Sequence, residues 1–230
     1  LYAFEAGEKL CAQSLLLAKE MQTTPFRLYA SAWGIVLQYF LQTDTLVLDH
    51  TIHLRPKCFQ GLLGSFVNNL PIRIPFEEME LFSDVVRFMD ENRTKERQHQ
   101  RATYTDIILR MRQQKELAES LELFNVSIDY PIRNHSFRLN FPGCRISFHR
   151  QILAEMIGDI CLVIEEKSNL PCSIRYKQGM DPHLVLTMAE AFLLVLGQAV
   201  ASPQIPIRQL RFISPEREAS LIESARQSLY

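Results

Sequence analysis

The sequence predicts an α/β fold, in which helices and a sheet are packed in layers. Segments with helical periodicity alternate along the chain with short segments rich in β-formers, which is typical of layered folds. Of the 230 residues 47% are hydrophobic, enough for a substantial core in one large or two small domains. The formal net charge of -1 argues against nucleic acid or acidic lipid as partners.

Helical patterns are predicted from the spacing of apolar residues and from capping residues. The second helix is the best defined, because Thr24 can cap its N-terminus and Pro25 suits its first position. Its apolar stripe includes Trp33, which is most simply a core residue. A later helix opens in the same way at Asp181-Pro182. The predicted helices cover residues 5–21, 25–41, 81–98, 104–114 and 181–200.

Strands are predicted where β-branched and aromatic residues cluster between turn signals. Residues 137–141 and 145–149 alternate around Pro142-Gly143, as a hairpin would. The other predicted strands cover residues 45–54, 70–74, 121–130, 160–165 and 172–176.

Candidate catalytic and metal-binding residues are few. Asp49 and His53 share one face of a predicted strand while His50 lies on the other, so a partly exposed edge is favoured over a metal site. The six histidines are scattered, and no nucleophile elbow, P-loop or dinucleotide fingerprint is present. Five widely spaced cysteines without a C-x-x-C pair favour reduced thiols. No catalytic residue, metal or directly bound cofactor is therefore assigned.

The stretch Leu63-Gly64-Ser65-Phe66-Val67-Asn68-Asn69-Leu70-Pro71-Ile72-Arg73 carries the most information. Gly64 allows a positive φ or a close approach of the backbone, and the asparagine pair brings amide groups into an apolar run. On physical grounds alone, the pair is most simply a turn before a strand.

This stretch resembles the G-x-F-V-N-T-x-x-x-R motif of condensation domains in nonribosomal peptide synthetases. It keeps Gly64, Phe66, Val67, Asn68 and Arg73, and replaces the Thr by Asn69. Arg55 falls where the family has the arginine of a glycine-arginine pair. Leu54 replaces the glycine of that pair, and Asp49 replaces another glycine of the family.

Further motifs extend the resemblance, in order, over residues 20–222. His99-Gln100 and Tyr104 resemble parts of a His-Gln-Asp-Tyr-Pro-Phe-Glu motif. Residues 123–126 and 174–181 are similar to later strands and the last helix, and 213–218 look like the linker into an adenylation domain. The H-H-x-x-x-D-G motif with the catalytic histidine does not occur.

The resemblance implies the C-terminal half of a condensation domain, with a chloramphenicol-acetyltransferase-like mixed sheet covered by helices. Residues 1–212 would form this subdomain and 213–230 a linker toward an adenylation domain. In the family, two halves enclose a tunnel where carrier-tethered donor and acceptor are joined by an amide bond. Arg55 would make an ion pair with the Asp of the motif in the missing half, and Gly64 and Arg73 would be structural. Phe66, Asn68 and Asn69 would line or brace the tunnel, with turn capping equally open for Asn68.

The expected partners are the N-terminal subdomain, carrier proteins that bring phosphopantetheine, and the adenylation domain. Alone, the chain is expected to be inactive. The alternatives are a non-catalytic carrier-docking scaffold and half of an epimerisation domain, although that branch spells Gly-Trp-Phe-Thr where this chain has Gly64-Ser65-Phe66-Val67. The amphipathic opening lacks the regions of a signal peptide, and no stretch of about eighteen apolar residues is recognised, so a cytoplasmic protein is expected.

The same resemblance predicts an incomplete surface. The strand and loop around Arg55, Phe66 and Asn68 would face the missing half, so apolar atoms there should be uncovered or should drive self-association. Residues 131–150, which in the family reach across to the other half, should be loosely held.

Overall fold

The computed structural model describes residues 1–118, 123–130, 143, 158–219 and 223. Its centre is a sheet in which six strands follow the order β1-β6-β5-β4-β2-β3. β2 pairs in parallel with β4, and β4 with β5, while the other neighbours are antiparallel. The strands are β1 (Tyr2–Glu5), β2 (Thr45–His53), β3 (Val67–Pro75), β4 (Val126–Asp129), β5 (Ile160–Ile164) and β6 (Pro171–Tyr176).

Five helices among the described residues pack around this sheet, and their ends agree with the capping signals. The Thr24 side chain accepts a hydrogen bond from the Arg27 amide, and Asp181 does the same for His183. The helices are α1 (Glu8–Glu20), α2 (Pro25–Leu41), α3 (Phe82–His99), α4 (Tyr104–Gln113) and α5 (Pro182–Ala201), with short 3-10 turns η1 (Lys57–Phe59), η2 (Phe76–Glu78) and η3 (Ile207–Gln209).

α2 is the centre of the helix layer and contacts α1, α3, α5 and the sheet. Trp33 is completely buried and its indole N–H donates to the Ser127 carbonyl of β4 at 3.1 Å. Its ring meets Phe192 of α5 edge to face, with centroids 6.3 Å apart. Trp33 therefore holds α2 between the sheet and α5, as a core residue should.

The two faces of the sheet differ in character because side chains alternate along each strand. Leu48, Val126 and Ile160 lie on the face that belongs to the hydrophobic core. Their neighbours Asp49, Ser127 and Cys161 therefore point to the opposite face. The predicted mixed sheet with helices is confirmed, and one of its faces is polar.

Several details differ from the expectation. Asn68 and Asn69 lie inside β3, paired with Ile52 and Thr51, so the predicted turn at these residues is wrong. β2 is an interior strand between β4 and β3, because β3 continues the sheet beyond it, so the predicted partly exposed edge is also wrong.

Other differences concern element ends and composition. β1 was not predicted, because four residues carry too little periodicity, and β4 is shorter than expected. The predicted hairpin at 137–149 and the predicted loose segment 131–150 lie outside the described residues, apart from Gly143. α5 does contain a stretch long and apolar enough to cross a membrane, contrary to the expectation from the sequence. Much of it is buried in the core, with Val185, Phe192 and Val195 fully covered.

Candidate functional site

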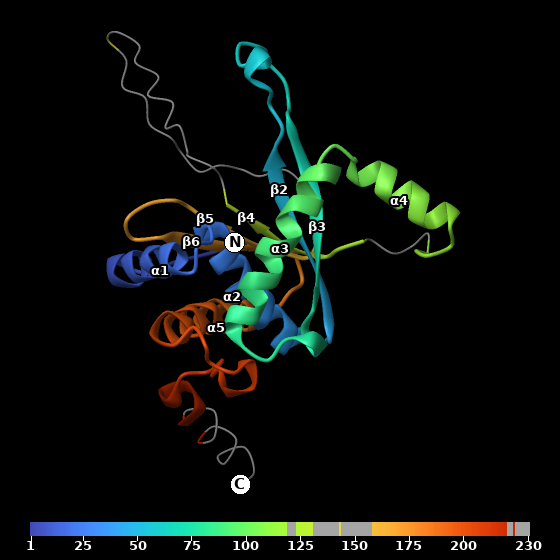
Figure 1. Ribbon diagram of the computed structural model, residues 1–230. Coiled ribbons are helices and arrows are strands. Elements are labelled where there is room, and N and C mark those ends of the chain that lie inside the picture. The colour runs from blue at the N-terminus through green and yellow to red at the C-terminus, as the bar shows by residue number, and fades with distance from the viewer. Residues whose placement is uncertain (119–122, 131–142, 144–157, 220–222, 224–230) are drawn as a thin grey trace.

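The β2–β3 hairpin extends beyond the rest of the sheet (Figure 1). Its connecting loop is held together by Arg55. The Arg55 guanidinium donates to the carbonyl oxygens of Phe59 at 3.0 Å, Leu62 at 2.5 Å and Gly64 at 2.9 Å. It also lies over the Phe66 ring, 4.1 Å from its centroid. Arg55 thus connects both ends of its own loop.

Gly64 has the positive φ that the motif suggested, at 149°, and a side chain there would be strained. The same loop exposes apolar side chains, with Leu63 fully exposed and Leu62 55% exposed. Phe59 is also exposed and its ring lies 6.0 Å from that of Phe66. The tip of the hairpin is therefore an apolar surface held in shape by one arginine.

We expect Arg55→Lys to loosen this loop with little change in global stability. Lysine keeps the charge, but a single ammonium cannot replace the planar fork that reaches three carbonyls and stacks on Phe66. Amide hydrogen exchange in residues 55–66 should accelerate, while the free energy of unfolding changes by less than about 1 kcal/mol because the loop is exposed. Arg73→Lys, at an exposed position of β3, is the control. Equal exchange in the two variants would contradict this role.

Asn68 and Asn69 point to opposite faces of β3 and make different contacts. The Asn68 amide donates to the carbonyl oxygens of Gln100 at 3.0 Å and Ala102 at 2.7 Å, so it braces the connection between α3 and α4. The Asn69 amide donates instead to Asp49 on the polar face, at 2.5 Å. Only Asn69 of this pair is directed to that face.

Asp49 begins a polar row across the sheet. The ladder places Asp49 opposite Ser127, Ser127 opposite Cys161, and Cys161 opposite Arg175, and we call these four residues together with Asn69 the polar row. Burial raises the pKa of Asp49 to about 7, against the hydrogen bond from Asn69, which lowers it. Burial likewise raises the pKa of the Cys161 thiol to about 11.

On the core side of the same strand, His50 lies beside a buried ion pair. Arg27 and Glu96 make a two-point salt bridge that joins the start of α2 to α3. His50 Nδ1 is 3.0 Å from the Leu70 carbonyl and must carry the proton of a neutral ring. Burial lowers the pKa of His50 to about 4, opposed by Glu96 and assisted by Arg27. This ion pair was not predicted from the sequence, because its partners are 69 residues apart.

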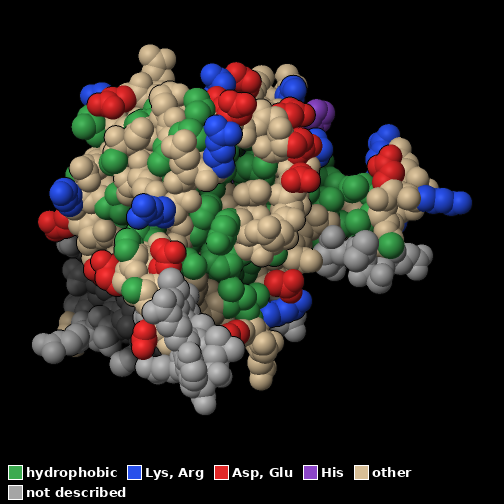
Figure 2. Space-filling model, turned by 90° about the horizontal axis from the view of Figure 1, so that it is seen from below, with side chains coloured by type: hydrophobic (Ala, Val, Ile, Leu, Met, Phe, Trp, Pro, Cys, Tyr) green, Lys and Arg blue, Asp and Glu red, His purple; other side chains and the backbone are tan. Residues whose placement is uncertain are grey.

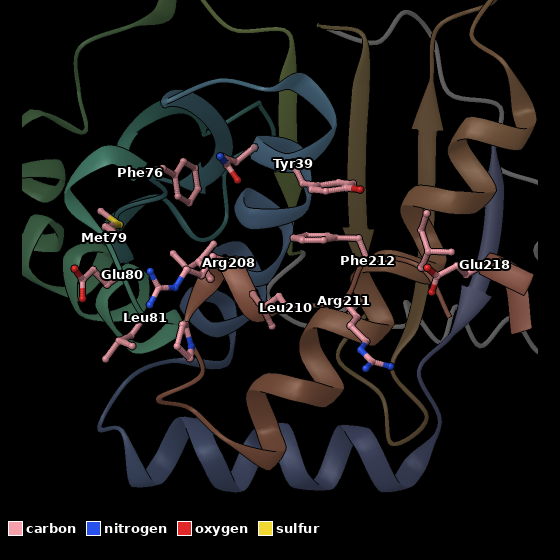
Figure 3. Close-up of a pocket in the computed structure, with 14 residues that line it drawn as sticks. Tyr39, Phe76, Met79, Glu80, Leu81, Arg208, Leu210, Arg211, Phe212 and Glu218 are labelled. Carbon is pink, nitrogen blue, oxygen red and sulfur yellow. The ribbon is translucent and has the colours of Figure 1, made fainter. Parts of the chain in front are cut away.

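A cavity of about 860 Å³ lies at the C-terminal side of the molecule, between the end of α2, η2 and residues 206–213. Figure 2 shows hydrophobic side chains gathered on the side of the molecule seen from below. In Figure 3 the rings of Tyr39 and Phe212 lie parallel, with centroids 3.9 Å apart. Both amide atoms of Gln198 bond the backbone of Arg211, so this segment is tied to α5.

Among the described residues, neither the hairpin loop nor the C-terminal cavity brings together side chains that form a recognisable catalytic site. Within the described ranges, no group of three His, Cys, Asp or Glu side chains is arranged to hold a metal ion. The ionisable residues that line the C-terminal cavity include Glu80, Arg208, Arg211 and Glu218. Of the residues predicted for the site, Arg55, Gly64 and Phe66 come together in the hairpin loop. The other predicted residues lie farther along β3; they are Asn68, Asn69 and Arg73. The polar row also contains residues that were not predicted for the site, among them Asp49 and Ser127.

The six-stranded mixed sheet with a helix layer on it agrees with the fold that the resemblance implied. The condensation domain family model matches residues 2–222, so the chain belongs to the condensation domain family. Among curated proteins, it is 24% identical over 230 residues to surfactin synthase subunit 2 of Bacillus subtilis (strain 168) and 22% identical over 223 residues to tyrocidine synthase 3 of Brevibacillus parabrevis. These matches cover 96% and 95% of this chain but only 6% and 3% of the two synthases.

Solved structures of low identity share the fold. A four-domain nonribosomal peptide synthetase bound to AMP and glycine matches with a TM-score of 0.81 and 17% identity, over 94% of this chain and 18% of that one. The X-domain from teicoplanin biosynthesis matches with a TM-score of 0.79 and 18% identity, over 91% of this chain and 48% of the X-domain chain. The first condensation domain of the CDA synthetase matches at 0.72 and 15% identity, over 92% of this chain and 47% of that one.

Proposed function

We propose that this chain is the C-terminal half of a peptide-synthetase condensation domain and forms one wall of the passage where an amide bond is made. The observation that carries the proposal is coverage: nearly the whole chain matches only 47% of the CDA synthetase condensation domain chain. The exposed apolar tip of the β2–β3 hairpin supports it, because such surfaces usually mark a partner. The partner in this proposal is the N-terminal half.

The residues divide into two roles under this proposal. Arg55 and Phe66 hold the hairpin loop in the shape that meets the other half, with the Arg55 guanidinium directed at an acidic residue there. Asn69 lines the passage on the polar face of the sheet. Asn68 points to the opposite face, where it braces the α3–α4 connection. Gly64 provides the positive φ that the loop of the hairpin needs, and Arg73 lies on the exposed surface of β3.

The reaction joins an acceptor amine to the thioester carbonyl of the donor and releases the donor carrier's thiol. Both substrates arrive on carrier proteins through phosphopantetheine, and this chain contributes by holding them in line. Correct orientation of amine and thioester accounts for a large share of the rate in such reactions. The catalytic histidine of the H-H-x-x-x-D-G motif belongs to the other half, so the chain alone is expected to be inactive.

The proposal includes a division of the chain into two parts. Residues 1–212 form the subdomain, and residues 213–230 form a linker to an adenylation domain. Residues up to Phe212 are held to the body by Gln198 and by the stacked Tyr39 ring. This chain covers only a few per cent of the length of its curated relatives, which agrees with a role as one tethered part of a longer protein. The cytoplasm is the location that accompanies this proposal.

The test restores the other half. A polypeptide extended upstream to include an H-H-x-x-x-D-G segment should form an amide between aminoacyl groups on donor and acceptor carriers, and changing its second His to Ala should abolish product. A folded polypeptide that binds carriers but forms no amide would overturn the catalytic assignment. That outcome favours the scaffold alternative, for which the departures at Asp49, Leu54 and Asn69 are the supporting observation.

A further inference from the structure

The last turns of α3, the connection after it and α4 carry a positive charge that the rest of the chain lacks. Residues 93–118 contain seven Lys or Arg against three Asp or Glu, a net charge of +4 in a chain whose formal total is -1. The remaining residues, which bring +4 to that total of -1, therefore carry -5. We call residues 93–118 the basic arm, because α4 projects from the body of the molecule beside β3 (Figure 1).

The basic side chains of the arm are exposed and are not neutralised by nearby acids. Six of them are exposed and make no ion pair with any residue that the structure describes; they are Arg93, Lys95, Arg97, Arg101, Arg110 and Lys115. Two of the three acids in the arm are engaged elsewhere. Glu96 pairs with the buried Arg27, and Asp106 accepts a hydrogen bond from the Thr103 hydroxyl at 2.7 Å. The arm therefore keeps a positive surface.

Helix stability accounts for only part of this charge. Cations in the last turn of a helix are favourable because they lie at the negative end of the helix dipole, and this accounts for Arg97 in α3 and Arg110 in α4. Arg93 lies one turn before Arg97, a spacing at which like charges repel each other. Arg101 lies beyond the end of α3. A partner that supplies negative charge would therefore relieve repulsion that the helix alone retains.

The arm is held in place and also offers an apolar contact. Asn68 of β3 donates to the carbonyl oxygens of Gln100 and Ala102, which anchors the connection between α3 and α4 to the β2–β3 hairpin. On α4, Leu109 is 52% exposed and is followed by Arg110. An apolar side chain bordered by polar and charged groups is typical of protein–protein interfaces. The arm is thus a charged surface of fixed position.

The charge distribution favours a compact acidic protein over an extended polyanion. A nucleic acid or an acidic bilayer would extend beyond the arm and meet the charge of -5 on the remaining residues, which repels it. A small acidic domain can contact the arm alone. The function proposed above requires small domains, the carrier proteins, to dock on this chain.

We propose that the basic arm is a docking surface for an acidic face of a carrier protein. This inference rests on the function proposed above, to which it adds the surface and the charge by which a carrier is recognised. Arg97 and Arg101 pair with carboxylates of the carrier, and Leu109 provides the apolar contact. Because charge at the rim of an interface acts mainly on the association rate, the effect of the arm should fall with rising salt.

Carrier binding to charge-reversed variants tests the inference. The probes are the carrier domains of the same synthetase, each with and without phosphopantetheine, and association with the 230-residue chain is followed by surface plasmon resonance. Arg97→Glu with Arg101→Glu should slow association of at least one carrier by about 10-fold at about 50 mM salt. The difference should shrink to less than about 3-fold at about 500 mM salt, because screening weakens attraction between exposed charges. Removing phosphopantetheine should not change this result.

A matched control separates the arm from net charge. Lys9→Glu with Lys19→Glu makes the same change in charge at exposed positions of α1, on the other side of the molecule from α4, and should associate as wild type does (Figure 1). Arg101→Glu with Arg110→Glu is a second arm variant, which keeps the test decisive if the first does not fold. Equal rates for the arm and α1 variants overturn the inference.

Three other results would also overturn it. They are no carrier binding by the wild-type chain, binding that requires phosphopantetheine, and a DNA duplex or acidic vesicle that binds the arm as tightly as a carrier does. Binding is read without amide formation, so this test is separate from the catalytic one. A chain that binds carriers through the arm, in a polypeptide that forms no amide, supports the docking surface and removes only the catalytic assignment.

Discussion

Replacing Glu96 with Gln should destabilise the protein by about 3–5 kcal/mol, because it leaves the Arg27 guanidinium buried without its counter-charge. The side chains of Arg27 and Glu96 are only 7% and 13% exposed, so water cannot replace the lost carboxylate. The pair joins α2 to α3 beside the buried His50. Loss of the ion pair should therefore weaken the packing of the helix layer. Urea unfolding with a fitted m-value measures the change.

Two comparisons make this result specific to the ion pair. Glu91→Gln makes the same chemical change at an exposed position of α3 and should alter stability by less than about 0.5 kcal/mol. The double change Arg27→Met with Glu96→Leu should recover most of the loss, because well-packed apolar pairs often equal buried ion pairs. A cost below about 1 kcal/mol for Glu96→Gln would contradict burial of the pair.

Local signals were sufficient for the helices and for much of the sheet. Thr24 and Asp181 cap the helices that they were expected to begin, because a capping side chain acts within three residues of itself. The interior of β2 was recognised from its composition, but its position between β3 and β4 was not. Neighbours in a sheet are chosen by long-range pairing, which a stretch of nine residues does not encode.

The sequence singled out some residues of the region described above, but not the way in which they are arranged. The motif singled out Asn68 and Asn69, yet only their register in β3 assigns one to the α3–α4 connection and the other to the polar face. In the sequence, Asp49 and Asn69 are two separate departures from the family motifs, 20 residues apart. Their contact follows from the β2–β3 pairing, and it changes two isolated substitutions into one interacting pair.

Stability should depend on pH in opposite directions at the adjacent residues Asp49 and His50. Burial raises the pKa of Asp49 from 3.8 to about 7, so between these values the folded state holds the extra proton and stability falls as pH rises. Burial lowers the pKa of His50 from 6.5 to about 4, so between these values the unfolded state holds the extra proton and stability falls as pH drops. From pH 4 to 6.5 the two effects oppose each other.

Asp49→Asn should expose the effect of His50 that the wild-type protein conceals. Each site contributes up to about 1.4 kcal/mol per pH unit, so the variant should lose stability relative to wild type by that slope as pH falls from 6.5 toward 4. The measurement is the free energy of unfolding in urea at pH 4.5, 5.5 and 6.5. Asp44→Asn, at an exposed position just before β2, should run parallel to wild type. If Asp49→Asn also runs parallel, Asp49 does not hold a proton in the folded state, and the buried, protonatable carboxyl group described above is wrong.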